Sequence, residues 1–237
     1  QSARMVNAFV ITPLRIGFLA LLISTTLEVL ASQGRARFRA ARWRKQMEDH
    51  YVVIGYGTKG RRAAQTLVNN GVEVRKIVVV DPRPDAQMEA NADGFAVING
   101  DATRRDVLHR AGIAEARRVL ISTDRDDSTV LATLTVRQLN PDVSIVAVVR
   151  EAENVPLAKQ SGADNVVTSA DAVGRLLGLS SLSPRLGSVM EDLLTYGEGL
   201  EVAERDILVN EVGKQPQQLP DQVIAVLRDE KVFRYFD

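Results

Sequence analysis

The stretch YVVIGYGTKG, residues 51–60, decides the fold. Its first four residues are apolar and lead into Gly55, Gly57 and Gly60, spaced as GxGxxG, before a helix-like run over 61–70. Gly55 can make a tight turn, Gly57 has no side chain to hold the backbone away from a pyrophosphate, and Gly60 lets the helix pack closely on the strand. The helix N-terminus offers free N–H groups to phosphates. The stretch therefore predicts the strand, turn and helix of a nucleotide-binding Rossmann half.

A second apolar run, Ile77–Val80, ends on Asp81, which lies 21 residues after Gly60. A carboxylate at this spacing can accept both hydroxyl hydrogen bonds of an adenosine ribose. It would repel the 2′-phosphate of NADP, so the sequence favours NAD(H) or an adenine nucleotide (ADP or ATP), a preference that Arg83 weakens. A Rossmann-like turn that has lost its ligand is the alternative interpretation.

The chain from residue 51 onward alternates apolar, strand-like runs with helix-like runs. Continuous Val and Ile runs are typical of strands buried on both faces, and hence of a parallel sheet. We predict an α/β fold with one doubly wound, Rossmann-like parallel sheet. The expected strands are 51–54, 74–80, 95–98, 118–122, 144–149 and 165–168, and the expected helices are 59–69, 85–91, 104–111, 126–139, 155–161 and 170–180.

Ligands of open parallel sheets bind beyond the carboxyl ends of the strands, and this rule selects the candidate site residues. We expect Arg83 to contact a phosphate or stack on an adenine, Asp101 and Thr103 to reach the adenine, and Thr123 and Asp124 to reach the ribose or the phosphates. Apart from Asp81, the residues after the second strand are equally well explained as helix caps. The candidate nucleotide-binding residues are Gly55, Tyr56, Gly57, Thr58, Lys59, Gly60, Asp81, Arg83, Asp101, Ala102, Thr103, Thr123, Asp124 and Arg150.

No pattern in the sequence indicates a reaction, so we expect a binding protein without catalytic residues. The chain has no Cys and only two histidines, of which we expect His50 to be an incidental surface residue and His109 to be structural or solvated. GxSxG, HExxH and Walker lysine motifs are absent. The acids Asp124, Asp126 and Asp127 leave a Ca²⁺ site open, although acids are also favoured at a helix N-terminus.

The first part of the chain has a different composition. Residues 5–27 are mostly apolar, and the block GRARFRAARWRK at 34–45 carries six basic residues and no acid. This order predicts a membrane helix that leaves the bilayer on its cytoplasmic side. Arg15 interrupts the roughly 20 apolar residues that a span requires, so an interfacial helix or a buried helix at an oligomer interface stays open.

The composition predicts four segments. These are an apolar membrane-type helix over 1–33, a basic helical linker over 34–49, the Rossmann domain over 50–183, and a small α+β subdomain over 184–237 that we expect to be incomplete. Thirty basic and thirty acidic residues cancel, which argues against nucleic acid as the main partner.

Four features together resemble the RCK/KTN (TrkA-N-like) regulatory domain of prokaryotic potassium channels and transporters. They are Ile54–Gly60, the acid Asp81, the GDAT sequence at Gly100–Thr103 and the SGAD sequence at Ser161–Asp164. The resemblance implies a gating module that binds NAD(H), ADP, ATP or, in some members, Ca²⁺. It also implies pairing through the helices after the late strands, assembly into a tetrameric or octameric ring, and a location at the cell inner membrane with the Rossmann domain in the cytoplasm.

The same resemblance makes the apolar helix an inner pore helix and the basic segment the linker that carries force to it. No selectivity filter is present, so the pore portion would lie upstream. Two other hypotheses stay open. One is a peripheral regulatory subunit of a potassium transporter, with the first thirty residues as a docking helix. The other is a Rossmann oxidoreductase, for which about fifty C-terminal residues without a His leave little room.

Overall fold

The computed structural model describes residues 18, 48–194, 202, 204–228 and 231–234. The chain divides into two compact units, Gln1–Glu191 and Asp192–Asp237. The predicted membrane helix, except for Phe18, and the linker up to residue 47 lie outside the described residues. Among the residues that are described, no helix is long and apolar enough to cross a bilayer.

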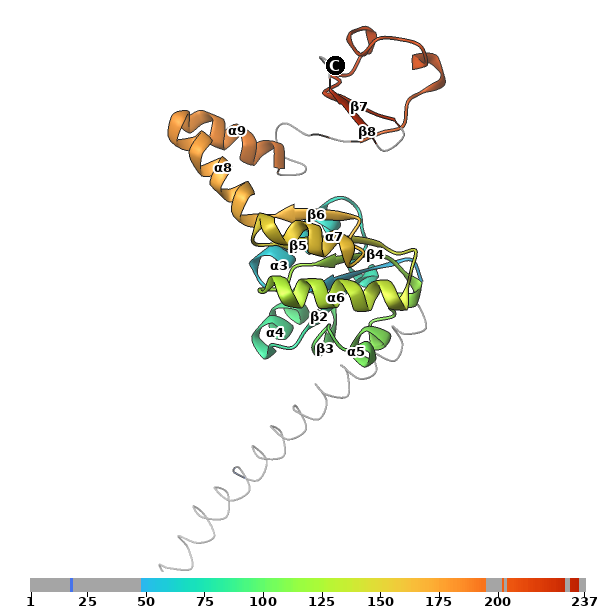
Figure 1. Ribbon diagram of the computed structural model, residues 1–237, viewed down its shortest axis with the longest axis vertical. Coiled ribbons are helices and arrows are strands. Elements are labelled where there is room, and N and C mark those ends of the chain that lie inside the picture. The colour runs from blue at the N-terminus through green and yellow to red at the C-terminus, as the bar shows by residue number, and fades with distance from the viewer. Residues whose placement is uncertain (1–17, 19–47, 195–201, 203, 229–230, 235–237) are drawn as a thin grey trace, which may run out of the picture. The chain divides into compact units, whose positions relative to one another are not determined.

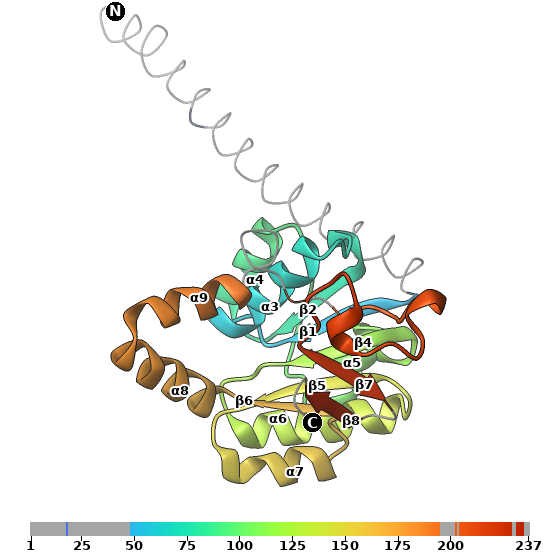
Figure 2. The same cartoon turned by 90° about the horizontal axis from the view of Figure 1, so that it is seen from above.

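The first unit contains a parallel sheet of six strands in the order β3-β2-β1-β4-β5-β6. The central strand β1 pairs with β2 on one side and with β4 on the other, so the order reverses between β1 and β4 (Figure 1 and Figure 2, with β1 labelled in Figure 2). Such a reversal opens a crevice beyond the carboxyl ends of the two strands. The strands are β1 His50–Ile54, β2 Ile77–Asp81, β3 Ala96–Asn99, β4 Ala116–Ile121, β5 Ser144–Val149 and β6 Asn165–Thr168.

Helices cover both faces of the sheet, which confirms the predicted Rossmann-like arrangement. Successive residues of a strand face opposite sides, so Val52 and Ile54 join one buried cluster while Val53 joins the other. The first cluster includes side chains of α5, α6 and α7, and the second includes side chains of α3 and α4 (Figure 2). The helices are α3 Thr58–Asn69, α4 Pro84–Ala92, α5 Arg105–Arg110, α6 Asp126–Leu139, α7 Val155–Gln160, α8 Ser169–Leu182 and α9 Pro184–Leu194.

The predicted strand over 74–80 is wrong at its start, because Val74–Lys76 forms a 3₁₀ turn, η2, before β2. The backbone N–H of Lys76 donates to the carbonyl oxygen of Glu73, and its ammonium group donates to the carbonyl oxygen of Glu48. The charged residues at 75 and 76 would be costly inside a strand that is buried on both faces. The strand therefore begins only where the sequence becomes wholly apolar.

The second unit is organised around the buried carboxylate of Glu211, which is only 3% exposed. It accepts hydrogen bonds of 2.8 and 2.9 Å from Arg205 and one of 2.9 Å from the backbone N–H of Leu208, and these bonds lower the pKa of Glu211 to about 2. Arg205 also donates to Asp221 at 2.6 Å. Residues 202 and 204–206 belong to neither a helix nor a strand.

The remaining elements of this unit are short. An antiparallel hairpin pairs β7, Ala225–Arg228, with β8, Lys231–Arg234. Two 3₁₀ turns, η5 at Val209–Glu211 and η6 at Pro216–Gln218, precede it.

His50 opens β1 and is 1% exposed, so the expectation of an incidental surface residue is wrong. Its Nε2 lies 3.0 Å from the carbonyl oxygen of Ala111, to which it donates. Because β1 is the central strand, its first residue is already covered by the elements on either side. Burial lowers the pKa of His50 below its ordinary value of 6.5, more than the bond to Ala111 raises it.

This lowered pKa makes stability depend on pH. Below pH 6.5 the unfolded chain protonates His50 while the folded chain resists it, so the contribution is complete above that pH and is lost as the pH falls. We expect the melting temperature to drop between pH 7.5 and 5.5 more steeply in the wild type than in His50→Gln. One titrating group can change the slope of the free energy of unfolding against pH by at most about 1.4 kcal/mol per pH unit. Parallel pH profiles from calorimetric melts would contradict this role of His50.

Candidate functional site

The glycine turn between β1 and α3 lies against the end of β4. Gly55 has a φ of +86°, and a Cβ atom there would lie 2.7 Å from the carbonyl oxygen of Ser122. A Cβ atom on Gly60 would collide with the carbonyl oxygen of Gly55. The Ser122 hydroxyl donates to that same oxygen at 2.9 Å. The turn and the β4 end are therefore packed backbone to backbone, and two of the three motif glycines are required by the fold itself.

Gly57, by contrast, is not crowded by backbone. A Cβ atom there would make only ordinary contacts, at 3.6 Å from Nη2 of Arg83 and 3.8 Å from Oδ1 of Asp124. The next residue, Thr58, begins α3, whose first turn holds no acidic residue. The first N–H groups of a helix lack intrahelical partners and carry a partial positive charge. This end of α3 thus keeps the properties that bind an anion.

Asp81 ends β2 beside this turn, and its side chain is 2% exposed. Its carboxylate accepts the backbone N–H of Tyr56 at 2.7 Å and that of Arg83 at 2.9 Å. The Arg83 guanidinium adds two bonds, from Nε at 3.2 Å and from Nη2 at 3.1 Å. Burial by itself would raise the pKa of Asp81, but these hydrogen bonds outweigh it and hold the pKa below its ordinary value. The carboxylate is therefore ionised at neutral pH.

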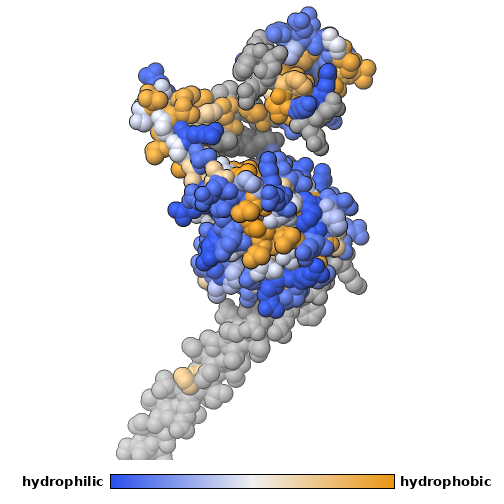
Figure 3. All heavy atoms as spheres, in the orientation of Figure 1, coloured by the Kyte–Doolittle hydropathy of each residue, from blue (hydrophilic) through white to orange (hydrophobic). Residues whose placement is uncertain are grey.

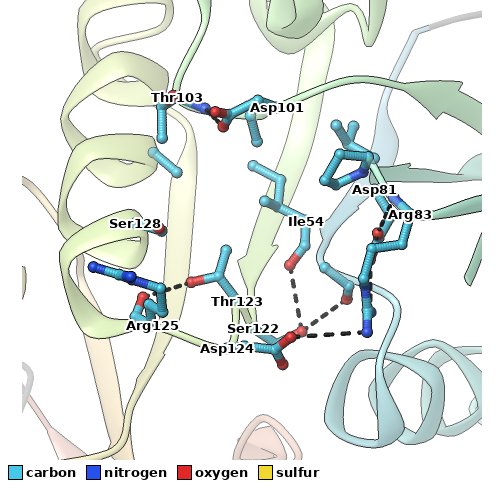
Figure 4. Close-up of a pocket in the computed structure, with 15 residues that line it drawn as sticks. Ile54, Asp81, Arg83, Asp101, Thr103, Ser122, Thr123, Asp124, Arg125 and Ser128 are labelled. Atoms are coloured by element: carbon cyan, nitrogen blue, oxygen red, sulfur yellow. Dashed lines mark hydrogen bonds and ion pairs between the residues drawn. The ribbon is translucent and has the colours of Figure 1, made fainter.

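A cleft of about 240 Å³ opens where the loops after β1, β2, β3 and β4 meet the start of α6 (Figure 4). Within it, Asp101 accepts the backbone N–H of Thr103 at 2.9 Å, and the hydroxyl group of Thr123 lies 2.6 Å from that of Thr129, which is buried behind the cleft. This is the crevice expected at the strand-order reversal. Its lining residues are Ile54, Gly55, Val80, Asp81, Pro82, Arg83, Asp101, Ala102, Thr103, Ser122, Thr123, Asp124, Arg125, Ser128 and Ala132.

Eight of the fourteen candidate residues line this cleft: Gly55, Asp81, Arg83, Asp101, Ala102, Thr103, Thr123 and Asp124. Tyr56, Gly57 and Thr58 instead line a second cleft beside α3 and α4, of which Arg83 is also part. Gly60 is buried behind the turn. Lys59 and Arg150 are exposed and line neither cleft.

Arg150 follows β5 at the same edge of the sheet but belongs to another set of contacts. Its Nε lies 3.4 Å from Oε1 of Glu151. The Asp126 carboxylate accepts the backbone N–H groups of both residues, at 2.7 and 3.1 Å, and the side-chain amide of Asn154. Asp126 thus ties the start of α6 to the loop after β5.

The other acids near this loop are also engaged. Asp127 is paired with Arg125, and Asp124 lies 3.8 Å from Arg83. Across the part of the chain that the structure describes, no three acidic or histidine side chains converge as a metal site would require. The Ca²⁺ alternative therefore gains no support there.

The sequence predicts Tyr56 as a residue of the turn but does not reveal the side chains that hold its ring in place. The ring is 1% exposed and packs edge-on against Phe95, with ring centroids 5.9 Å apart. The hydroxyl group donates to Asp93 at 2.8 Å, and Arg61 pairs with the same carboxylate at 2.9 Å. Burial and the bond to Asp93 raise the pKa of Tyr56. No sequence signal links Tyr56 to an acid 37 residues away.

Ser122, Arg125 and Ser128 also line the cleft and were not among the candidates. A signal for Ser122 exists, because it is the first polar residue after the apolar residues 119–121 that end β4.

The SGAD sequence is explained by Arg137 of α6. Its guanidinium donates to the carbonyl oxygen of Gly162 at 2.6 and 3.1 Å and to the Asp164 carboxylate at 3.0 Å. Asp164 also accepts the backbone N–H of Ile145 at 2.7 Å. The sequence is therefore structural, because it fixes the start of β5 to the loop before β6. The GDAT residues, in contrast, belong largely to the cleft.

Comparison with known proteins matches the part of the chain that contains the six-stranded sheet and the cleft. The model of a family described as the TrkA-N domain matches residues 51–169. A probable potassium channel protein of Methanocaldococcus jannaschii is 32% identical over 64% of this chain and 43% of its own length. The glutathione-regulated potassium-efflux system protein KefC of Cronobacter sakazakii is 30% identical over 60% of this chain and 22% of its own length.

A solved structure of the GsuK channel bound to NAD is similar with a TM-score of 0.50 and 28% identity, over 56% of this chain and 23% of the GsuK chain. The matched region makes up less than half of each of these three proteins.

The close packing of the turn predicts that Gly60→Ala is destabilising. The added methyl group must displace the Gly55 carbonyl, and overpacking of this kind costs about 1–3 kcal/mol. Gly174→Ala in α8 is the matched control, because a Cβ atom there meets nothing within 4 Å. The control is expected to be neutral or slightly stabilising. Equal melting temperatures for the two variants would contradict the packing described for the turn.

Proposed function

Because this chain belongs to the TrkA-N domain family, we propose that it is a nucleotide-sensing regulatory domain of a potassium channel or transporter. The observation that carries the proposal is the meeting of the Gly55–Gly60 turn and the buried, ionised Asp81 at the strand-order reversal.

An adenine nucleotide fits the chemistry of the cleft. Asp81 would accept the ribose hydroxyls, and the face of Gly57, which no backbone crowds, would receive the phosphates together with the N-terminus of α3. The loop with Asp101 and Thr103 would border the adenine. The NAD-bound GsuK channel supports a dinucleotide as one ligand. NAD(H), ADP and ATP are the ligands to test, and NADP is disfavoured because its 2′-phosphate would meet an ionised carboxylate.

The position of the site on β1 suggests how binding could reach a pore. The glycine turn follows the last residue of β1, whereas the predicted linker over 34–49 leads into its first residue, His50. A nucleotide can shift a conformational equilibrium only by its differential affinity for the two states. We propose that the bound and unbound domains present the linker differently, and that the segment over 1–33 is an inner pore helix at the inner membrane, with the Rossmann domain in the cytoplasm.

The similarity to KefC keeps the transporter alternative, in which the domain regulates an efflux system as part of the transporter or as a peripheral subunit.

A sensor fits the cleft better than an enzyme. The residues that line it are one glycine, small hydroxyl residues, apolar residues, three carboxylates and two arginines, and none of these fifteen is a His, Cys, Lys or Tyr. Proton transfer at neutral pH most often uses such groups, or a carboxylate whose pKa is raised. Asp81 has the opposite shift. This set suits recognition of a nucleotide rather than an oxidoreductase reaction.

We also propose that copies of the domain pair through the face formed by α6 and α7, as a step toward a tetrameric or octameric ring. Leu131 and Leu134 of α6 and Leu157 of α7 are 52%, 43% and 52% exposed. Figure 3 shows hydrophobic surface on this face of the first unit. The family resemblance assigns pairing to the helices after the late strands, so the occupant of this surface is a second copy of the chain.

Loss of the Asp81 carboxylate tests nucleotide binding. Asp81→Asn keeps the volume and an acceptor for the Tyr56 N–H, but removes the charge that strengthens the hydrogen bonds to the ribose. We expect affinity for ADP, ATP or NAD(H) to fall by about tenfold or more in calorimetric titrations.

The control for this experiment is Asp106→Asn, which removes an exposed acid that pairs with Arg104; neither of these two residues lines either cleft. It should change the affinity by less than twofold. Unchanged binding in Asp81→Asn, with the melting transition intact, would show that the ribose lies elsewhere.

Disruption of the α6–α7 face tests self-association. Leu134→Lys places a charge in the proposed contact and should shift sedimentation velocity profiles toward monomer by at least an order of magnitude in protein concentration. Met88→Lys makes the same change at an exposed apolar residue on α4, on the other face of the sheet. If both variants assemble like the wild type, copies of the chain do not pair through this face.

A further inference from the structure

We propose that Arg83 is a latch on the nucleotide site, because its guanidinium takes the positions on the Asp81 carboxylate that a ribose diol requires, so that a nucleotide binds by displacing it. This inference rests on the proposed function and adds to it a residue that sets the affinity and the ligand preference of the same cleft. It reverses the simpler expectation that Arg83 only adds attraction for phosphate.

The Asp81 carboxylate has no free hydrogen-bond acceptor position for a ribose. An ionised carboxylate has about four lone-pair positions. Four N–H groups already occupy them: the backbone N–H of Tyr56, the backbone N–H of Arg83, and Nε and Nη2 of Arg83. The two backbone bonds are fixed by the fold. A ribose with two hydroxyl groups can therefore be accepted only where the two guanidinium bonds are released.

The Arg83 guanidinium also lies over the glycine turn. A Cβ atom on Gly57 would lie 3.6 Å from Nη2 of Arg83, so the side chain covers the face that a pyrophosphate would approach. Its Nη1 reaches 3.8 Å from Oδ2 of Asp124, on the far side of the cleft at the end of β4 (Figure 4). One side chain thus spans the cleft from the β2 end to the β4 end.

The Arg83 side chain can leave Asp81 without any refolding of the domain. The Arg83 side chain is 42% exposed and belongs to the residue just before α4. It lines both the cleft at the strand ends and the second cleft beside it, where Asp85 offers a carboxylate and Glu89 already pairs with Arg61. Rotation of the guanidinium into the second cleft, or onto the phosphates of the incoming ligand, would keep its charge compensated.

The latch predicts a ligand preference. Adenosine must break the Arg83–Asp81 pair and gives the guanidinium nothing in return, whereas ADP or NAD supplies phosphates that can bind it. The affinity for adenosine should thus be reduced most, which restricts the site to phosphorylated ligands. An arginine that acts only as a phosphate ligand predicts no effect on adenosine and a loss for ADP when it is removed.

The test compares Arg83→Ala and Arg83→Gln with the wild type, using the full 237-residue chain and calorimetric titration with adenosine, ADP and NAD. We expect adenosine to bind about tenfold more tightly to both variants, because neither can form the two-point pair with Asp81. The gain for ADP and NAD should be smaller. Arg104→Ala is the matched control, since Arg104 pairs with Asp106 across the same two-residue spacing and lines neither cleft. It should change each affinity by less than twofold.

The outcomes separate the two proposals. Unchanged or weaker binding of adenosine to both folded variants, with ADP or NAD still bound by the wild type, would overturn the latch and leave the proposed function in place. Absence of binding of all three ligands to the wild type and to both variants would overturn both proposals. Binding to the variants alone would support the latch and show that it holds the wild-type site closed.

Discussion

The site in this chain depends on one hydrogen bond, from the backbone N–H of Tyr56 to the carboxylate of Asp81. It joins the turn after β1 to the end of β2, two segments that the backbone bond from the N–H of Gly55 to the carbonyl oxygen of Val80 also links. The ring of Tyr56 is in turn held by Phe95 and Asp93, and the backbone of the turn is held by Ser122. Because the bond is buried and its acceptor is charged, breaking it would leave the Tyr56 N–H unpaired and remove one of the four donors that stabilise the Asp81 carboxylate. The shape of the cleft follows from this constraint.

Most of the fold could be predicted from patterns that are local in the sequence. Continuous Val and Ile runs identified the parallel strands, and the spacing from Gly60 to Asp81 brought the acid to the glycine turn. The features that were missed depend on contacts between distant residues. Burial of His50 follows from the central place of β1, which no local pattern reveals. The short turn at Val74–Lys76 shows that charges next to an apolar run can belong to the connection rather than to the strand.

The distinction between local patterns and contacts of distant residues also applies within the site. The rule on strand ends found the loops that form the cleft, because topology alone brings those ends together. It could not tell that Arg150 belongs to a cluster around Asp126, or that Arg83 binds Asp81 instead of extending toward solvent. Side-chain pairing is decided by which acceptors remain once the backbone is satisfied. The residues that regulate affinity are therefore harder to read from a sequence than those that form the binding surface.

A structure of the chain crystallised with ADP or NAD would show whether a nucleotide binds at the glycine turn by displacing Arg83. We expect density for the nucleotide along the glycine turn, both ribose hydroxyls within hydrogen-bond distance of Asp81, and the Arg83 guanidinium moved away from that carboxylate. A nucleotide bound elsewhere, or bound at the turn while the Arg83–Asp81 pair stays intact, would contradict this mode of binding.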